Sequence, residues 1–530
     1  MTQKARIEIS GVRVPYEAGA DCDAEALSRA KALLRRETGL KAEDARLAKK
    51  SVDARRGITF VYTVCAETEA KEDLPSLLEN KPGLRLYSEP RLELPVGEKR
   101  MRGAPVVVGF GPAGMFAALT LAEAGMKPLV LERGAPVDER CAAVERFVKE
   151  GILDPSSNVQ FGAGGAGTFS DGKLVTRISD PLVAWVLKTF YELGAPEDIL
   201  WRSKPHIGTD ILRSVVKRAD EKIRALGGEI RYHTAASDIG GGSLLADGER
   251  LSYDALILAI GHSARDTVTD LIGAGYAVEA KPFSVGVRAE HLQSAVDEAL
   301  FHAHAGDPAL GKGEYQLSTH IGGRGCYTFC MCPGGVVIPS ASEAGGVVTN
   351  GMSTRARDGR NANAAVCVSV GPEDFGSDPL GAIAFQRALE QKAFAAGGGD
   401  YTAPYQTVGD FMNGKSGMAY TDVVPSYRDG RVKEADFEKL FPRFVTETLR
   451  AGLADFAKKL RGYDKPSAIL TGVETRTSSP VRILRGGDGR AETDPSVFPC
   501  GEGAGYAGGI TSAAVDGIRA AQRVLAIYRP

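Results

Sequence analysis

Residues 106–132 hold the pattern that most restricts how this chain can fold. The apolar run Val106–Val108 is followed by Gly109-Phe110-Gly111-Pro112-Ala113-Gly114 and then by a segment with the apolar character of a helix. In such a strand–turn–helix the first glycine forms the tight turn, the second lets backbone approach a pyrophosphate, and the third allows close packing of helix on strand. The pattern predicts a Rossmann-like α/β domain that binds a dinucleotide.

An acidic residue stands where this fold needs one. Glu132 follows the next apolar run, Pro128–Leu131, and lies 21 residues after Gly111. An acid at the end of this second strand accepts hydrogen bonds from ribose hydroxyls. The start of the helix offers unpaired N–H groups and its positive dipole end to phosphates. We therefore expect residues 109–114 to hold the pyrophosphate and Glu132 to hold the ribose.

A second glycine-rich turn lies near the C-terminus. Phe498-Pro499-Cys500-Gly501-Glu502-Gly503-Ala504-Gly505 and then Gly508-Gly509-Ile510 precede a segment typical of a helix. A helix that begins at Ile510 would point its positive dipole end at a flavin ring and stabilise the reduced, anionic form. The first turn alone suits NAD as well as FAD, and the second turn favours FAD, bound without a covalent bond.

The remaining patterns divide the chain into domains. Residues 1–98 predict a ferredoxin-like α+β domain with strands at 6–9, 45–52, 58–66 and 84–92, a helix capped by Asp23 and ending near Glu37, and a second helix at 74–78. Residues 99–275 and 475–530 predict the two segments of the FAD-binding domain. Residues 276–474 mix strands, loops and long helices, and predict an interposed substrate or cap domain. The expected fold class is therefore α/β.

Composition narrows the environment and the partners. The formal net charge is −2, which gives no electrostatic case for nucleic acid. The apolar run Ala255–Ile260 is far shorter than the roughly 20 residues of a membrane span. The eight cysteines are scattered, and no apolar segment follows Met1–Arg6 as it would in a signal peptide. We expect a cytoplasmic protein with a small-molecule substrate and an electron donor or acceptor that the sequence does not identify.

Several longer runs resemble one group of flavoproteins. Glu132-Arg133-Gly134, Leu258-Ala259-Ile260-Gly261 and the C-terminal glycine turn resemble the two-dinucleotide-binding-domain flavoproteins. The runs 161–174, 204–210, 261–266, 281–288 and 330–335 resemble, more narrowly, a bacterial family of FAD-dependent dehydrogenases, also described as NAD(FAD)-utilising dehydrogenases. The resemblance covers nearly the whole chain. It implies FAD binding and a redox role, and leaves the substrate open.

The resemblance also implies which residues hold the cofactor. Those near the pyrophosphate and the adenosine are Gly109, Gly111, Pro112, Ala113, Gly114, Glu132, Arg133 and Ala236. Those that wrap the pyrophosphate or meet the ribityl chain and flavin ring are Gly164, Gly165, Ala166, Gly167, Thr168, Gly261, Gly501, Glu502, Gly509 and Ile510.

No second Rossmann turn is convincing. Gly162–Gly167 also fits G-x-G-x-x-G, but Ser156-Ser157-Asn158 stands upstream in place of a strand, and Gly273-Ala274-Gly275 lacks the third glycine. We therefore expect NAD(P)H, if used as reductant, to bind only transiently over the flavin.

The candidate catalytic residues are Lys173, Cys330 and Cys332. Lys173 lies just after the glycine-rich loop and suits a carboxylate anchor or a proton donor. Cys330 and Cys332 predict either a redox pair or two structural cysteines on one side of an extended strand. The absence of C-x-x-C argues against a disulfide reductase of the familiar kind. His320 and Cys326 lie nearby, but the ligands do not form the two pairs of a zinc site, so we expect no metal.

These features predict an FAD-dependent dehydrogenase or reductase that moves a hydride or electrons between flavin and a small organic substrate. Two alternatives stay open. One is a flavin monooxygenase. The other is a non-catalytic flavoprotein scaffold that uses the N-terminal domain, where Lys49-Lys50 and Arg55-Arg56 form a small basic patch.

Overall fold

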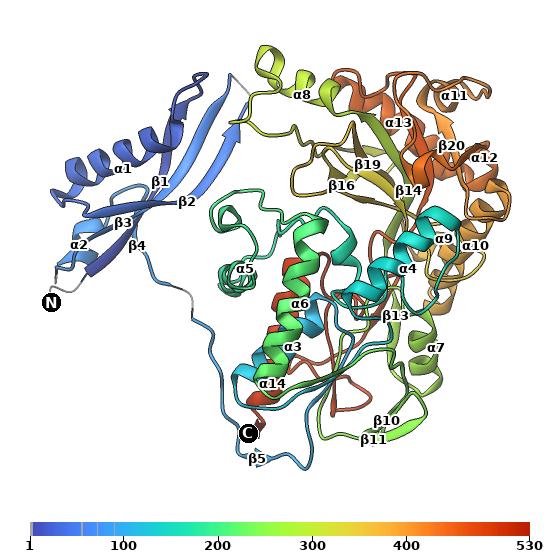
Figure 1. The fold of residues 1–530 in the computed structure, drawn as a ribbon, viewed down its shortest axis with the longest axis horizontal. Helices are drawn as coiled ribbons and strands as arrows, with labels where there is room; N and C mark the ends of the chain where they lie inside the picture. The colour runs from blue at the N-terminus through green and yellow to red at the C-terminus, as the bar shows by residue number, and fades with distance from the viewer. Residues whose placement is uncertain (1–3, 55–56, 72, 90) are drawn as a thin grey trace.

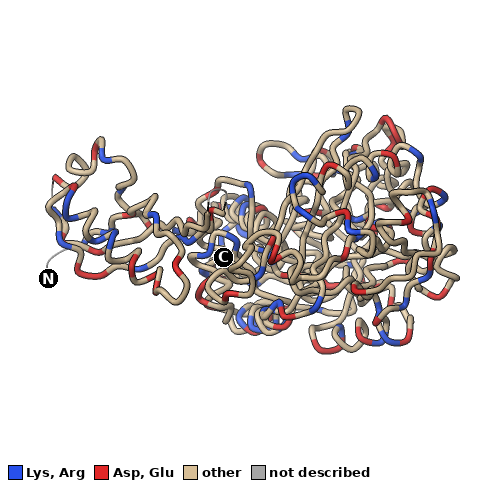
Figure 2. The backbone as a smooth tube through the Cα atoms, turned by 90° about the horizontal axis from the view of Figure 1, so that it is seen from above, with Lys and Arg blue, Asp and Glu red and all other residues tan. Residues whose placement is uncertain are grey.

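The computed structural model describes residues 4–54, 57–71, 73–89 and 91–530. A small N-terminal domain stands beside a much larger body and is joined to it by an extended segment (Figure 1). Figure 2 shows Lys and Arg interspersed with Asp and Glu over both parts. Within the described ranges, no helix has the length and apolar character needed to cross a membrane.

The N-terminal domain confirms the predicted ferredoxin-like order. Its elements are β1 Lys4–Pro15, α1 Cys22–Thr38, β2 Asp44–Asp53, β3 Thr59–Glu69, α2 Leu74–Leu78 and β4 Leu84–Leu86. The sheet order is β2-β3-β1-β4, and each neighbouring pair is antiparallel. The apolar residues of the strands and α1, such as Ile9, Ala30 and Val64, are fully buried between sheet and helices.

Two expectations for this domain were wrong in detail. Asp21, not Asp23, caps α1, because its Oδ1 accepts a 3.0 Å hydrogen bond from the Ala24 N–H. Asp23 instead accepts hydrogen bonds from Lys50 and Tyr62. The last strand ends at Leu86 rather than at residue 92, although one more backbone hydrogen bond, from Tyr87 N to Arg6 O at 2.8 Å, continues its contact with β1. Pro90, within the predicted strand, lies outside the described residues.

The N-terminal domain is docked on the larger body at two places. The outer edge of β2 exchanges backbone hydrogen bonds with residues 201–203, from Lys50 N to Trp201 O at 2.7 Å and from Ser203 N to Lys50 O at 2.9 Å. Phe301 and Leu310 join the apolar core of the N-terminal domain. The domain therefore bridges two separate regions of the body.

The first of these regions is a parallel sheet with the predicted Rossmann-like form. It contains β6 Val106–Val108, β7 Leu129–Leu131, β8 Glu229–Arg231, β12 Leu256–Leu258 and β24 Val497–Pro499. The strand order is β24-β12-β6-β7-β8, and all pairs are parallel. We call this part of the protein the parallel-sheet domain. It needs both chain segments, because β24 comes from the C-terminal one.

The packing of two helices holds the two chain segments of the parallel-sheet domain together. α3, Pro112–Glu123, packs against α14, Ile510–Leu525. The contact is backbone against backbone, since a Cβ added at Gly517 would lie 2.0 Å from the Ala113 carbonyl oxygen.

Other elements of this domain are α4 Val137–Glu150, η1 Ala166–Phe169, α5 Leu182–Glu192, η2 Glu197–Leu200, α6 Thr209–Ala225, α7 Arg265–Gly273 and the antiparallel strands β9 Ala236–Gly240, β10 Ser243–Ala246 and β11 Glu249–Ser252.

The second region is a seven-stranded mixed sheet, which we call the mixed-sheet domain. Its order is β15-β16-β19-β14-β22-β20-β21. The strands are β14 Phe283–Leu292, β15 Ser318–Ile321, β16 Arg324–Cys332, β19 Asn361–Val370, β20 Ala403–Thr407, β21 Val432–Glu434 and β22 Ile469–Glu474. α13, Arg443–Lys459, packs on β15, β16 and β19, and α10, Pro379–Gly397, packs on β20 and β22.

Short elements complete the described fold. They are α8 Gln293–Phe301, η3 His302–His304, α9 Pro372–Phe375, α11 Val408–Asn413, η4 Tyr427–Gly430 and α12 Phe437–Leu440, with the strand pairs β5 Lys99–Arg100 and β25 Tyr528–Arg529, β13 Val278–Ala280 and β23 Val481–Ile483, and β17 Val336–Pro339 and β18 Thr349–Met352. β5 lies in the segment that joins the N-terminal domain to the parallel-sheet domain, and its pairing with β25 anchors that segment beside Tyr528–Arg529.

A buried charge cluster joins the two large domains. Glu390 of α10 accepts hydrogen bonds from Arg265 at 2.7 and 2.9 Å and from Arg476 at 3.1 and 3.2 Å. Glu390 and Arg265 are almost completely buried. Burial opposes the effect, but the charges of Arg476 and Arg265 lower the pKa of Glu390 to about 2.

We expect Glu390→Ala to lower the free energy of unfolding by about 3–5 kcal/mol, because it leaves the buried Arg476 guanidinium without a carboxylate and Arg265 with Glu343 alone. Glu373→Ala removes an exposed carboxylate 4.0 Å from Arg324 and should cost less than about 0.5 kcal/mol. Urea denaturation near neutral pH measures both. Equal losses would show that the cluster does not hold the domains together. The lowered pKa also means that this stabilisation is present above pH 4.5 and is lost as the pH falls towards 2.

Candidate functional site

The glycine-rich segments of the sequence meet at one place in the structure. A Cβ added at Gly165 would lie 2.9 Å from the Gly111 Cα, and one added at Gly503 would lie 2.5 Å from the Gly261 carbonyl oxygen. A Cβ at Gly501 would lie 2.7 Å from the Ala113 Cβ. Side chains at these positions would therefore hold apart the turns at 109–114, 164–168, 261 and 501–510.

The first turn has the shape that a phosphate requires. Gly109 has φ +97°, and a Cβ at Gly114 would lie 1.9 Å from the Gly109 carbonyl oxygen, so only glycine fits either position. No side chain caps α3 at Gly111, and the first helical hydrogen bond runs from Met115 N to Gly111 O at 2.8 Å. The N–H groups of the first turn are thus directed at the space in front of the helix.

Glu132 has a structural role that the motif did not predict. Its carboxylate accepts hydrogen bonds from the backbone N–H groups of Phe110 at 2.7 Å, Gly134 at 2.9 Å and Gly162 at 3.0 Å. The side chain therefore ties the first turn to the loop that leads into Gly164–Thr168. Each carboxylate oxygen accepts two hydrogen bonds, so Oε2 keeps one position for a ribose hydroxyl.

Residues expected near the adenosine surround Glu132. Backbone hydrogen bonds from His233 N to Gly134 O at 3.0 Å and from Thr234 N to Glu132 O at 2.9 Å bring the segment before Ala236 to this end of the sheet. The Arg133 guanidinium lies 4.5 Å from the centre of the Phe161 ring and pairs with Asp266.

Arg133 also lines a cavity of about 480 Å³ between the two large domains. Its other polar lining comes mainly from three short segments: Ser263, Arg265 and Asp266; Ser342 and Glu343; and Arg387, Glu390 and Gln391. The first segment lies in the run 261–266 of the family resemblance, and the sequence analysis identified neither of the other two.

The C-terminal turn borders open space. A Cβ added at Gly261, Gly508 or Gly509 would meet no atom within 4 Å, although Gly501 and Gly503 beside them are tightly packed. Gly509 precedes α14 with φ +103°, and no side chain caps the helix. Ile510 touches the loop residue Gly167, whose added Cβ would lie 3.1 Å from it. The two uncapped helices and the open turn fit the pyrophosphate and ring ends of a flavin dinucleotide.

Glu502 is the acid beside this open turn. Burial raises its pKa to about 7, opposed by the Gly509 N–H and by the positive charge of Lys281. A negative charge on Cys330 raises it further. Glu502, Lys281 and Cys330 are therefore close enough to act on one another, and Glu502 can hold or release a proton near neutral pH.

Lys173 belongs to a second charged group. Its Nζ lies 3.4 Å from Asp171 and 3.5 Å from Glu314, and Arg357 binds both of these carboxylates. Burial opposes the shift, but Glu314 and Asp171 raise the pKa of Lys173, so the side chain stays cationic. Its Nζ also donates a hydrogen bond to the Met331 carbonyl oxygen, which places it against the Cys330–Cys332 segment.

The two cysteines do not lie in a regular strand as we expected. Phe329 pairs with Ala365 and Cys332 with Asn363, so Cys330 and Met331 share one position opposite β19 in a β-bulge. Cys330 has φ +45°. The bulge nevertheless keeps the two cysteines in contact, because the Cys332 thiol donates to the Cys330 carbonyl oxygen at 3.4 Å, and Arg288 donates to the same oxygen at 2.9 Å.

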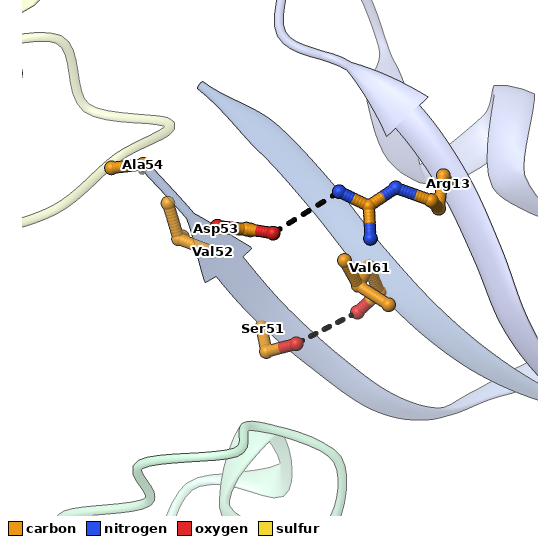
Figure 3. Close-up of a pocket in the computed structure, with 6 residues that line it drawn as sticks. All are labelled: Arg13, Ser51, Val52, Asp53, Ala54 and Val61. Atoms are coloured by element: carbon orange, nitrogen blue, oxygen red, sulfur yellow. Dashed lines mark hydrogen bonds and ion pairs between the residues drawn. The ribbon is translucent and has the colours of Figure 1, made fainter. Parts of the chain in front are cut away.

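Two other features do not add to this site. Cys326 is buried against Gly452, and among the described residues no three His, Cys, Asp or Glu side chains are grouped as metal ligands. A surface hollow of about 510 Å³ lies on β1–β3 of the N-terminal domain, where Arg13 pairs with Asp53 at 3.1 Å and Ser51 donates to Val61 O at 3.1 Å (Figure 3). It contains none of the glycine-rich segments.

Comparison with known proteins agrees with this geometry. Residues 104–295 match the family model described as pyridine nucleotide-disulphide oxidoreductase. Residues 282–477 match the model described as FAD-dependent protein, C-terminal domain-like. The two matches together span the first glycine-rich turns and the mixed-sheet domain.

Similar solved structures include CtdE in complex with FAD, which is 10% identical with a TM-score of 0.29 over 79% of this chain and 82% of that one. Another is halogenase PltM in complex with phloroglucinol and FAD, 10% identical with a TM-score of 0.35 over 80% of this chain and 67% of that one. At these TM-scores neither likeness supports a conclusion.

A full-length relative decides the family. A protein of Clostridium beijerinckii (strain ATCC 51743 / NCIMB 8052), described as an uncharacterized protein, is 45% identical over 488 residues, which cover 90% of this chain and 91% of the relative. The chain therefore belongs to the family of this Clostridium protein, and its matched domains make it an oxidoreductase with FAD as its cofactor.

Proposed function

We propose that the protein is an FAD-dependent dehydrogenase or reductase that moves a hydride or two electrons between the flavin and a small organic substrate. One observation carries the proposal. Glu502, a carboxyl group that holds a proton, borders the open space at Gly508 and Gly509. The side chain of Cys330 and the ammonium groups of Lys281 and Lys173 lie near this space. Groups that hold protons and stabilise negative charge are what such a transfer requires.

The roles of the chain's own residues follow from their positions. The turns at 109–114 and 164–168 would hold the pyrophosphate, Glu132 and Arg133 the adenosine, and Gly261, Gly501, Gly509 and Ile510 the ribityl and ring end. The bound flavin supplies the two-electron chemistry. Glu502 holds the proton that accompanies reduction, and the Lys173 ammonium stabilises negative charge on a substrate.

The reductant we propose is a pyridine nucleotide that binds transiently, which the description of the matched 104–295 model supports. We further propose that the protein acts in the cytoplasm, because all eight cysteines are free. The scaffold alternative rests on a basic patch of which Arg55 and Arg56 lie outside the described residues. Lys50 of that patch pairs with Asp23 at 2.6 Å and covers the Phe60 ring, a structural role.

Anaerobic reduction tests the reaction class. We expect NADH or NADPH to bleach the flavin without oxygen, and organic oxidants to restore its colour. If nucleotide oxidation requires both oxygen and an organic substrate, the protein is a monooxygenase and the proposal fails.

Gly111→Val should weaken FAD binding at least about tenfold, because its side chain occupies the phosphate space and each lost charged hydrogen bond is worth about 1.5–3 kcal/mol. The free protein should still fold, since Gly111 has φ −79° and an added Cβ lies 3.7 Å from Gly165. Acid release and mass analysis of the flavin measure the loss, and should identify FAD rather than FMN in the wild type.

Gly103→Val is the matched control, because an added Cβ there meets nothing within 4 Å. It should retain its FAD. Full flavin content in the Gly111 variant, or equal losses in both, would show that the first turn does not bind the phosphates.

Glu502→Gln should remove a pH dependence rather than the cofactor. Because the pKa of Glu502 is about 7, the rate of flavin reduction in the wild type should change between pH 6 and 8. The neutral amide cannot titrate, so the variant should keep its FAD and lose this inflection. Stopped-flow reduction across the pH range measures it, and an unchanged inflection in the variant would assign the titration to another group.

A further inference from the structure

Cys330 and Cys332 have a backbone geometry that a purely structural pair does not need. Cys330 occupies the left-handed region at φ +45°, which costs a non-glycine residue about 1–3 kcal/mol and persists only where its surroundings hold it. The surroundings here are two cations, since Arg288 and Lys173 donate to the carbonyl oxygens of Cys330 and Met331. Bulges beside active sites redirect side chains in this way.

The two thiols differ in their electrostatics. A hydrogen bond from Cys332, together with the charges of Arg288 and Lys173, lowers the pKa of Cys330 to about 6 against the opposing effect of burial. The pKa of Cys332 is raised. Burial raises the pKa of Cys326 to about 12 and also raises that of Cys367. The pair thus contains one thiolate and one thiol at neutral pH. Cys326 and Cys367, in the same sheet, both stay protonated.

The two thiols also differ in solvent exposure, and the pair lies towards the proposed cofactor site. Cys330 is half-buried, whereas Cys332 is fully buried. Cys330 is close enough to Glu502 to act on its charge, and Glu502 belongs to the turn that ends at Gly509. An accessible thiolate with a buried thiol in contact behind it is the arrangement of an attacking and a resolving cysteine.

We propose that Cys330 and Cys332 form a redox-active dithiol–disulfide pair that receives two electrons from the reduced flavin and passes them to a disulfide substrate. The proposal rests on the proposed function, because it needs a flavin that is reduced by a hydride donor such as NAD(P)H. It names the substrate class that the proposed function leaves open.

Electrons and protons balance over the proposed cycle, which consists of two thiol–disulfide exchanges and one reduction of the Cys330–Cys332 disulfide. The Cys330 thiolate attacks one sulfur of the substrate disulfide, forms a mixed disulfide and releases the first substrate thiolate. Cys332 loses its proton and attacks the Cys330 sulfur, releasing the second thiolate and closing the Cys330–Cys332 disulfide. Two protons convert the released thiolates to thiols. The new disulfide would then take two electrons from the reduced flavin and one proton, which restores the Cys330 thiolate and the Cys332 thiol.

The one-residue spacing suits this role. A disulfide between residues so close in the chain is strained, and strained disulfides are readily reduced. The familiar disulfide reductase motif, C-x-x-C, is absent from the sequence, and the bulge instead brings the thiols of C-x-C together.

Anaerobic titration of the holoenzyme tests the pair directly. After oxidation by cystamine and its removal, the wild type should take up about four electrons per FAD from dithionite, two for the flavin and two for the disulfide. Cys330→Ser should take up about two, whereas Cys332→Ser, which cannot close the Cys330–Cys332 disulfide, should carry one cysteamine on Cys330 that mass analysis detects. Cys141→Ser, at a half-buried cysteine of α4, should match the wild type.

Thiol counting after denaturation gives a second readout. The cystamine-oxidised wild type should show two fewer titratable thiols than the eight of the sequence, and peptide mapping should find Cys330 joined to Cys332. Uptake of two electrons with all eight thiols present would overturn the pair. Flavin content and two-electron flavin reduction in the serine variants report separately on folding and on the proposed function.

Two disulfides distinguish the substrate source. With NADPH or NADH as reductant, turnover of glutathione disulfide would identify a small-molecule substrate, and turnover of insulin would identify a protein disulfide. Either activity should fall at least a hundredfold in Cys330→Ser. If neither disulfide is reduced by a wild type that takes up four electrons, the substrate class is wrong.

Discussion

The rest of the structure depends on the close approach of backbones that are distant in the chain. Gly517 of α14 lies against the Ala113 carbonyl of α3, and Gly503 lies against Gly261. A single Cβ at either glycine would push these segments apart. The position of the glycine-rich turns, the closure of the parallel sheet by β24, and the placement of Glu502 near the cysteines all follow from this contact.

Around this contact the protein places its charges in pairs. Lys173 and Arg357 are balanced by Asp171 and Glu314, and Arg288 is balanced by Glu474. Paired charges can be buried in a protein interior at a lower free-energy cost than isolated ones. The thiolate of Cys330 is stabilised by cations that are already held in place, so the site has little need to rearrange when its charge changes.

Local patterns in the sequence predicted the elements well. The strand–turn–helix at 106–123, the ferredoxin-like order and the helix at Ile510 depend on glycine positions and apolar periodicity, which act over a few residues. What failed depends on partners remote in sequence. The bulge at Cys330 needs β19 and Arg288, and the second role of Glu132 needs the loop at Gly162. The roles expected for the individual cofactor residues stay predictions.

The docking of α14 on α3 also sets an order of events during synthesis. The sheet of the N-terminal domain can form as soon as its strands leave the ribosome, because it is complete by Leu86, and Phe301 and Leu310 join its core later. The parallel-sheet domain has to wait for its last strand and helix, so β12 keeps an unpaired edge and α3 an uncovered apolar face through about 240 residues of further translation. The glycine-rich turns therefore cannot come together until β24 and α14 have been made.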